Sequence, residues 1–310
     1  MRRIEYTRYG GPEELHLADF QQAPPVGNQI QVRIKAASAN PMDWKIREGA
    51  VKMMTGKTFP RGVGTDFSGV VQAVGPDVRR FKPGDEVFGA MSMRDSATFS
   101  EVIVTGEETA ALKPSAIGFE VAATLPIAGA TAWTALIDTA ALRRGQRVLI
   151  NGCLGGVGRA ALQIARVHGA SIVGTCGATG VAEARGLGAE EAIDYRKFDY
   201  RGHRKSFDIV FDTAGSLGPR KCLSMLKPGG VALHINLSPL KMIQILLTRR
   251  NKAVIAKLPP DLLEKLGELA VQGNLKLPIA GIVPLTEAIP AITKLETSGQ
   301  PKGKLVIVPA

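Results

Sequence analysis

The stretch RVLINGCLGGVGRAALQIARVH, residues 147–168, decides the fold. Residues 147–151 are mostly apolar and predict a short buried strand, and a turn rich in glycine follows at 152–158. From Val157 to His168 apolar residues recur at helical spacing, and Gly169 ends the pattern. A strand, a tight turn and a helix in this order predict the start of a parallel, doubly wound α/β sheet.

The glycines of this turn suit it to phosphate. Glycines at 152, 155, 156 and 158 permit a tight turn, a close approach of the backbone to a pyrophosphate, and close packing of the helix on the strand. The N–H groups and positive partial charge of a helix N-terminus favour anions. The alternative is a glycine-rich turn that binds no ligand. The strand before the glycines and the helix after them favour a dinucleotide site.

The next predicted strand, 171–175, indicates which dinucleotide is bound. Proteins that bind NAD place Asp or Glu about 20 residues after the glycines, on the ribose 2′-hydroxyl. Here the strand runs into Thr175-Cys176-Gly177-Ala178, and the first acid, Glu183, comes only in the following helix. An uncharged pocket leaves room for a 2′-phosphate, so the sequence predicts NADPH. The candidate cations for that phosphate are Arg185, Arg196 and Lys197.

The rest of the chain divides into a β-rich first part, an α/β middle and a mixed tail. Short strands bounded by Gly and Pro, as in a barrel-like β domain, are predicted at 29–36, 69–74, 86–88 and 99–104. Near Val121 the sequence changes, with helices over 122–142 and later strands at 193–195, 208–212 and 231–235. The tail predicts helices at 261–271 and 286–295 and a closing strand at 304–308.

The composition argues against several classes of protein. The 310 residues carry a formal charge of +11, but Lys and Arg are scattered, so we expect no nucleic-acid partner. No run of about 20 apolar residues predicts a membrane span, and residues 1–10 lack the apolar core of a secretory signal. Three irregularly spaced cysteines, Cys153, Cys176 and Cys222, indicate a reducing compartment. We therefore expect a cytoplasmic protein with no membrane contact.

Further motifs recur over nearly the whole chain. They are YGGPE at 9–13, ANPMDWKIREG at 39–49, GTDFSGVV at 64–71, FKPGDEV at 81–87, AGATA at 128–132 and GKLV at 303–306. Together with the glycine turn, they resemble the zinc-independent quinone oxidoreductase branch, which includes zeta-crystallin, of the medium-chain dehydrogenase/reductase superfamily. These motifs are specific to the superfamily and less specific about the substrate.

The resemblance implies a fold of two domains. A GroES-like, β-rich catalytic domain would comprise residues 1–122 and 262–310, and a Rossmann NADP-binding domain residues 123–261. The active site would be the cleft between these domains. Members of the family are commonly homodimers, so we expect a homodimer here.

The resemblance also implies a set of cofactor contacts. These place Asn40, Thr131, Asn236 and Leu237 near the nicotinamide, Gly155, Gly156, Val157 and Gly158 on the pyrophosphate beside Gly152, and Thr175, Cys176 and Tyr195 around the adenosine ribose and its 2′-phosphate. The family often has Ser and Lys where Gly177 and Ala178 stand, so the ligands of the phosphate stay open. For Asn40 and Thr131 the alternative is turn and helix-cap chemistry.

The sequence predicts no metal. Catalytic zinc needs three protein ligands. The zinc dehydrogenases of the superfamily have Cys near positions 40–43 and Gly-His-Glu where Gly64-Thr65-Asp66 stands, and both are missing here. The four cysteines of the structural zinc lobe are missing too, and the four histidines are scattered. Asp43 and Asp66 alone would make a poor zinc site.

The absence of zinc ligands favours reduction over alcohol oxidation. Hydride transfer to an electrophilic conjugated group needs no strong Lewis acid, so we expect NADPH to reduce a quinone or the β-carbon of an enone. Asn40 is the best candidate to donate a hydrogen bond to the developing enolate, with Asp43 and Lys45 behind it. For Asp43 and Lys45 the alternative is a structural ion pair or a solvated turn.

Three other functions stay open. An enoyl or 2-alkenal reductase shares every motif with a quinone reductase. A non-catalytic NADPH-binding protein on the same fold would also keep the glycine turn, although the intact segment around Asn40 argues against it. A nucleic-acid binder is suggested only by the net charge.

Overall fold

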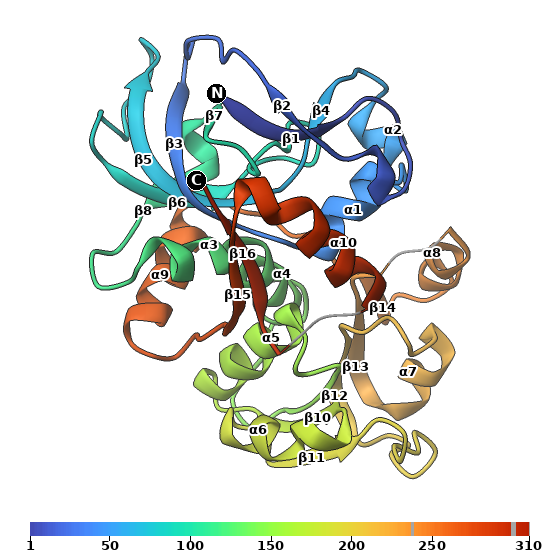
Figure 1. Ribbon diagram of the computed structural model, residues 1–310. Coiled ribbons are helices and arrows are strands. Elements are labelled where there is room, and N and C mark those ends of the chain that lie inside the picture. The colour runs from blue at the N-terminus through green and yellow to red at the C-terminus, as the bar shows by residue number, and fades with distance from the viewer. Residues whose placement is uncertain (237–238, 299–301, 310) are drawn as a thin grey trace. The chain divides into compact units, whose positions relative to one another are not determined.

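The computed structural model describes residues 1–236, 239–298 and 302–309 (Figure 1). The chain forms two compact units. The first comprises Met1–Ile127, Leu258–Gln272 and Leu277–Ala310, and the second comprises Ala128–Lys257 and Gly273–Lys276. No helix among the described residues is long and apolar enough to cross a membrane.

The second unit is built on a sheet of six parallel strands. These are β9 (Arg147–Asn151), β10 (Ser171–Cys176), β11 (Glu191–Asp194), β12 (Phe207–Asp212), β13 (Leu226–His234) and β14 (Asn251–Ala253). Their order in the sheet is β11-β10-β9-β12-β13-β14, which is the doubly wound order of a Rossmann fold. The predicted parallel α/β sheet is confirmed, and β9 begins and ends where the sequence predicted.

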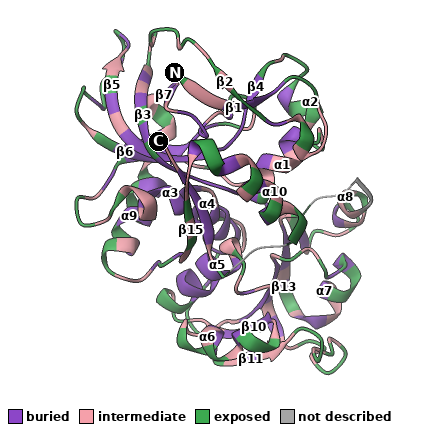
Figure 2. Ribbon diagram, in the orientation of Figure 1, coloured by how far each residue is buried: buried purple, intermediate pink, exposed green. Residues whose placement is uncertain are grey.

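Helices follow the strands of this sheet, as crossover connections require. They are α5 (Gly156–Val167), α6 (Val181–Gly186), α7 (Pro219–Met225) and α8 (Pro239–Leu246). Helix α4 (Pro126–Trp133) leads into the unit and continues as a π-helical turn at Thr134–Thr139. Val148, Leu149 and Ile150 of β9 are fully buried, which is the burial expected of a central parallel strand. Helix α5, which follows β9, is largely purple, the colour of buried residues, in Figure 2.

The first unit contains a larger, mostly antiparallel sheet and a small one. The larger sheet has the order β15-β16-β3-β5-β6-β8, with β7 paired to β3. Its strands are β3 (Gln29–Ser38), β5 (Asp66–Val74), β6 (Glu86–Ala90), β7 (Val102–Gly106), β8 (Ala110–Leu112), β15 (Ile279–Pro284) and β16 (Lys304–Val308). The small sheet joins β1 (Arg2–Tyr6) to β2 (His16–Asp19) and β4 (Arg61–Gly62). This unit is the predicted GroES-like domain.

The helices of the first unit are short at the start of the chain and longer near its end. They are α1 (Pro41–Arg47), α2 (Lys52–Thr55), α3 (Phe119–Thr124), α9 (Pro260–Val271) and α10 (Ala288–Ser298). Strand β16, at the red end of the colour scale, lies beside blue β3 (Figure 1), and the two pair antiparallel with Val306 opposite Ser38. This pairing brings the end of the chain next to the residues before α1.

Two differences from the predicted elements have local causes. The strand predicted at 99–104 is observed at Val102–Gly106, because the Phe99 amide bonds Val63 and its carbonyl accepts from Ile4, outside the ladder with β3. Strand β15 was not predicted. It ends at Pro284 and contains Gly281, and both residue types disfavour strands, but parallel pairing with β16 holds it in the sheet.

Candidate functional site

The glycine turn after β9 has a backbone that only glycine fits. Gly152 has a φ of +81°, and its N–H points back to the carbonyl oxygen of Thr175 at 3.1 Å. A Cβ on Gly158 would lie 2.1 Å from the Gly152 carbonyl oxygen. The close approach of α5 to the turn therefore requires glycine at 158.

The N-terminus of α5 is exposed at Gly155, and the turn before it is fixed by a hydrogen bond from Arg159. Gly155 is exposed, and a Cβ there would meet nothing nearer than 3.5 Å. The N–H groups of Gly156, Val157 and Gly158 form the first turn of a twelve-residue helix, where no intrahelical acceptor exists. Buried Arg159 donates from Nε to the Leu154 carbonyl oxygen at 2.8 Å, which fixes the turn. These features fit the pyrophosphate of a dinucleotide.

The carboxyl end of β10 carries no acidic side chain. Thr175 is buried and donates to Asn151 Oδ1 at 2.6 Å, and Cys176 is also buried. A Cβ on Gly177 would meet nothing within 4 Å, so the space beside it is open. Glu183, the first acid after the strand, is paired with Arg159 at 2.6 Å. The predicted absence of an acid on this end of β10 is therefore observed, while Asp194 lies opposite Cys176 on the neighbouring strand β11.

A tyrosine and an arginine lie next to this end of β10. The Tyr195 amide donates to the Cys176 carbonyl oxygen at 2.9 Å, while its ring is 55% exposed. The Arg196 guanidinium lies over that ring, 5.1 Å from its centre. Arg185 and Lys197, the other two candidate cations, are exposed. The structure thus brings Tyr195 and Arg196 together beside Cys176.

A polar network that was not predicted joins the carboxyl ends of the central strands. Asn151 Nδ2 donates to Asp212 Oδ1 at 2.7 Å, and the Lys241 ammonium donates to Asp212 Oδ2 at 3.0 Å. The sequence does carry a signal for it, because Asn151 and Asp212 end two of the strands predicted for the parallel sheet. This network fixes the edge of the sheet from which the glycine turn leaves.

Two further predicted residues of the second unit are Thr131 and Asn236. Thr131 is in α4 and buried, and Asn236 follows β13 and is exposed. Gly215, with a φ of +75°, leaves room for the Asn236 side chain, since a Cβ there would lie 2.5 Å from Asn236 Nδ2. Leu237 lies outside the described residues.

Asn40 belongs to a buried polar cluster in the first unit. It precedes α1, and its backbone N–H donates to Asp43 Oδ2 at 2.7 Å. Its Nδ2 donates to Asp66 Oδ2 at 2.8 Å and makes longer contacts with Ser38 O at 3.3 Å and Thr65 Oγ1 at 3.4 Å. The Thr65 hydroxyl in turn donates to Asp43 Oδ1 at 3.1 Å.

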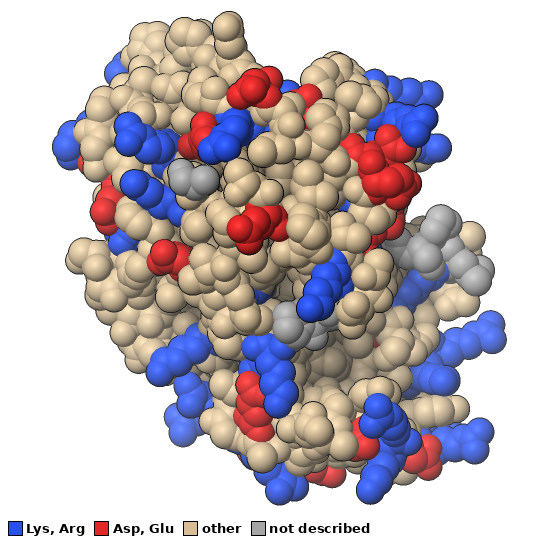
Figure 3. Space-filling view, viewed as in Figure 1, with Lys and Arg blue, Asp and Glu red and all other residues tan. Residues whose placement is uncertain are grey.

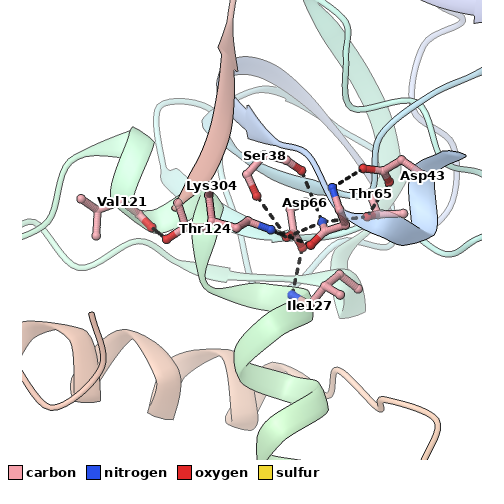
Figure 4. Close-up of polar contacts among 9 residues, drawn as sticks. Ser38, Asp43, Thr65, Asp66, Val121, Thr124, Ile127 and Lys304 are labelled. Carbon is pink, nitrogen blue, oxygen red and sulfur yellow. Dashed lines mark hydrogen bonds and ion pairs between the residues drawn. The ribbon is translucent and has the colours of Figure 1, made fainter. Parts of the chain in front are cut away.

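Asp66 and Lys304 lie at the centre of this cluster (Figure 4). Lys304, at the start of β16, donates from Nζ to Asn40 Oδ1 at 2.6 Å and lies 3.7 Å from Asp66 Oδ2. Asp66 is fully buried, and its Oδ1 accepts from the backbone N–H of Ile127, in the first turn of α4. A carboxylate at a helix N-terminus is favourable. One carboxyl therefore links β5, α1, β16 and α4.

Burial changes the protonation of these groups. Desolvation raises the pKa of Asp43 to about 7, and the nearby Asp66 charge adds to that shift. Burial also raises the pKa of Asp66, although the Lys304 ammonium opposes this. The pKa of Lys304 is lowered by its own burial. The Asp43 carboxyl therefore titrates near neutral pH.

Sequence reasoning found Asn40 and Asp43 but missed Lys304. Lys45, the third predicted catalytic residue, lies in α1 and is half-buried. Ser38 and Thr65, which were not predicted, each donate a hydroxyl hydrogen bond to a carboxylate of the cluster. Across the described residues no three His, Cys, Asp or Glu side chains gather as metal ligands would. The positive charge next to the Asp66 carboxyl is the ammonium of Lys304.

Comparisons with known proteins agree with this architecture. Residues 27–140 match the family described as alcohol dehydrogenase GroES-like domain, and residues 187–307 match the family described as zinc-binding dehydrogenase. The chain is 32% identical to the 2-methylene-furan-3-one reductase of Solanum lycopersicum, over all of this chain and 79% of that protein.

Two solved structures are similar over their full length. The quinone oxidoreductase from Coxiella burnetii has a TM-score of 0.91 and 32% identity, covering 100% of this chain and 99% of the other. The Escherichia coli quinone oxidoreductase complexed with NADPH has a TM-score of 0.87 and 28% identity, with 100% of each chain covered. The chain belongs to the quinone oxidoreductase branch of the medium-chain dehydrogenase/reductase superfamily.

Proposed function

We propose that this protein is an NADPH-dependent reductase that transfers a hydride to quinones or to the activated C=C bond of α,β-unsaturated carbonyl compounds, without a metal. The observation that carries the proposal is the glycine turn at the N-terminus of α5, next to a β10 end that has no acidic side chain. Relatives named quinone oxidoreductase and 2-methylene-furan-3-one reductase support both substrate classes.

The preference for NADPH over NADH rests on the surroundings of Cys176. A carboxylate at the end of β10 would repel a 2′-phosphate, and Glu183, in the following helix α6, is paired with Arg159. Asp194, opposite Cys176 on β11, accepts from the backbone N–H of Arg196 at 3.1 Å. Arg196, held over the Tyr195 ring, is our candidate to pair with the phosphate. It would take the place of the Ser and Lys that Gly177 and Ala178 lack.

Metal independence rests on the Asn40 cluster. The buried ammonium of Lys304 already lies 3.7 Å from Asp66 and 2.6 Å from Asn40 Oδ1. A metal ion bound by these oxygens would have to displace a cation that the fold holds in place. A divalent ion next to a buried ammonium would also suffer strong repulsion at low dielectric.

NADPH, when bound, supplies the hydride. The chain itself then has to bind the cofactor, orient the substrate against it and exclude water from the site. We assign the pyrophosphate to the first turn of α5, and we assign the orientation of a carbonyl oxygen to the amide of Asn40. Asp43 and Thr65 lie behind Asn40 and keep its backbone in place.

The experiment compares NADPH and NADH oxidation with one small quinone and one 2-alkenal, in the presence and absence of a chelator. We expect a higher kcat/KM with NADPH and no effect of the chelator. In Arg196→Ala the KM for NADPH should rise roughly 10-fold, which corresponds to the loss of one charge-assisted contact, while the KM for NADH stays unchanged. Arg204→Ala, at an exposed arginine of the same unit that is not a candidate for the phosphate, is the matched control.

The outcomes separate the remaining alternatives. A faster reaction with NADH would overturn the assignment of the 2′-phosphate, and loss of activity on chelation would overturn metal independence. Tight binding of NADPH without turnover of any quinone or enone would favour a non-catalytic protein. The ratio of quinone to alkenal turnover decides between the two reductase classes.

We further propose a homodimer in a reducing compartment such as the cytoplasm. All three cysteines are buried free thiols, which suits a reducing environment. Light scattering at micromolar concentration tests the oligomeric state, and a mass of one chain would contradict it.

A further inference from the structure

The buried ammonium of Lys304 contacts both the Asn40 amide and the Asp66 carboxyl. We propose that Lys304 is a positioning residue for the reduction, which holds the amide of Asn40 in one orientation together with Asp66. The inference rests on the proposed function, since it concerns the same site.

The two ends of the Asn40 amide have opposite partners. Lys304 Nζ, which can only donate, lies 2.6 Å from Asn40 Oδ1. Asp66 Oδ2, which as a carboxylate can only accept, lies 2.8 Å from Asn40 Nδ2. Rotating the amide by half a turn would place its NH2 against an ammonium and its oxygen against a carboxylate. One orientation is therefore strongly preferred.

The geometry of Lys304 favours the amide over the ion pair. Its Nζ is 3.7 Å from Asp66 Oδ2 but 2.6 Å from the neutral oxygen of Asn40. A lysine that only neutralised Asp66 would be expected to approach it closely, because the attraction of two charges grows as they near each other. Burying an ammonium is costly, and an apolar side chain of similar length would fill the same space. Packing alone therefore gives no reason for a lysine at this position.

The two N–H groups of the Asn40 amide are held with different strength. One Nδ2 hydrogen is used in the short bond to Asp66. The other makes the contacts at 3.3 Å with Ser38 O and 3.4 Å with Thr65 Oγ1, which are the longest hydrogen bonds of this amide. This hydrogen is the one that a carbonyl oxygen in the site would accept. Lys304 and Asp66 together decide where it points.

The test measures kcat, the Kd for NADPH and the Tm for the wild type, Lys304→Met, Asn40→Ala and the double variant. We expect Lys304→Met to lower kcat about 10- to 100-fold, the effect of a misplaced group near the reaction, with the Kd for NADPH little changed. Lys294→Met, at an exposed lysine of the same unit, is the matched control and should keep the wild-type kcat.

The double variant separates positioning from packing. If Lys304 acts through Asn40, Lys304→Met should have no further effect on kcat once Asn40 is alanine, although it still lowers the Tm. Equal factors on kcat in both backgrounds would show a general structural role and overturn the inference. Should Lys304→Met not fold, Lys304→Gln is measured with the opposite expectation. Because it keeps a donor for Asn40 Oδ1, it should hold kcat within a few-fold of the wild type, and a roughly 10-fold fall at unchanged Tm would overturn the inference.

Failure of the inference and failure of the proposed function look different. A wild type that binds NADPH but reduces no quinone or 2-alkenal overturns the proposed function and this inference with it. An active wild type with an unchanged kcat in Lys304→Met overturns the inference alone.

Discussion

Asp43 is a buried carboxyl, 3% exposed, and burial disfavours its charged form. Its carboxyl accepts from the Asn40 backbone N–H and from the Thr65 hydroxyl, and both bonds favour the charged form. Burial outweighs them and raises the pKa of Asp43 to about 7, helped by the nearby Asp66 charge. The Asn40 cluster can therefore take up or release a proton near neutral pH.

This buried carboxyl should make stability depend on pH. The pKa of Asp43 rises from an ordinary 3.8 to about 7 on folding, so the folded state binds more protons than the unfolded state between these values. The free energy of unfolding should then fall as pH rises through this window, by ~1.4 kcal/mol per unit of pKa difference and a few kcal/mol in all. Urea unfolding at several pH values measures it.

The Asp43→Asn variant should flatten this dependence. Part of the slope should remain, because the pKa values of Asp66 and Glu48 are also raised. Asp19→Asn, at an exposed carboxyl, should keep the wild-type slope. An Asp43→Asn protein as pH-dependent as the wild type would show that Asp43 is charged in the folded state.

Single residues also show how far sequence reasoning reaches into the site. Asn40 and Asp43 are neighbours in the chain, and their motif predicted them as site residues. Lys304 is 264 positions from Asn40 and reaches it only because β16 pairs with β3. No local pattern shows that pairing, so the cation of the cluster was not predictable from the residues around Asn40.

Among the elements, those with a strong local pattern were predicted best. Strands β9 and β16 are apolar runs with clear ends, and both are observed with the predicted bounds. Helix α5 begins one residue earlier than predicted. Strands β1, β2 and β15 were missed, because short or Pro-bounded strands depend on a partner elsewhere in the chain.

Among the elements, we expect cofactor binding to depend most on helix α5 and its close contact with the glycine turn. Gly158→Ala would place a Cβ 2.1 Å from the Gly152 carbonyl oxygen, so the helix must move away from the turn. We expect the Kd for NADPH to rise at least about 10-fold, because the helix N–H groups lose their alignment with the phosphates. The Tm should fall as well. Fluorescence titration with NADPH and thermal unfolding measure both.

A second glycine provides the control for this prediction. Gly186 ends α6, is exposed, and a Cβ there would meet nothing within 4 Å. Gly186→Ala should keep the wild-type affinity for NADPH and raise stability by up to about 1 kcal/mol, because alanine is the better helix residue. Normal NADPH binding by Gly158→Ala would mean that the turn does not hold the pyrophosphate.

On the scale of the whole molecule, the net positive charge lies in one of the two units. The second unit has 20 Lys and Arg against 8 Asp and Glu, whereas the first has 19 against 20. The whole net charge of +11 thus comes from the unit that holds the glycine turn. On the face in Figure 3, Lys and Arg crowd the surface around α6 and α7. Lys and Arg are scattered along the sequence, but the excess of positive charge lies in the second unit.

This distribution should speed the arrival of a polyanionic cofactor. A positive field over one unit raises the local concentration of an anion and its association rate. Raising the ionic strength from about 0.01 M to about 0.15 M shortens the Debye length from about 30 Å to about 8 Å. We expect the association rate constant of NADPH to fall several-fold over this range, with little change in its dissociation rate. For NADH, which lacks the 2′-phosphate, the fall should be smaller. Stopped-flow fluorescence measures both rate constants. An association rate constant of NADPH that does not change with ionic strength would contradict attraction of the cofactor by the charge of the second unit.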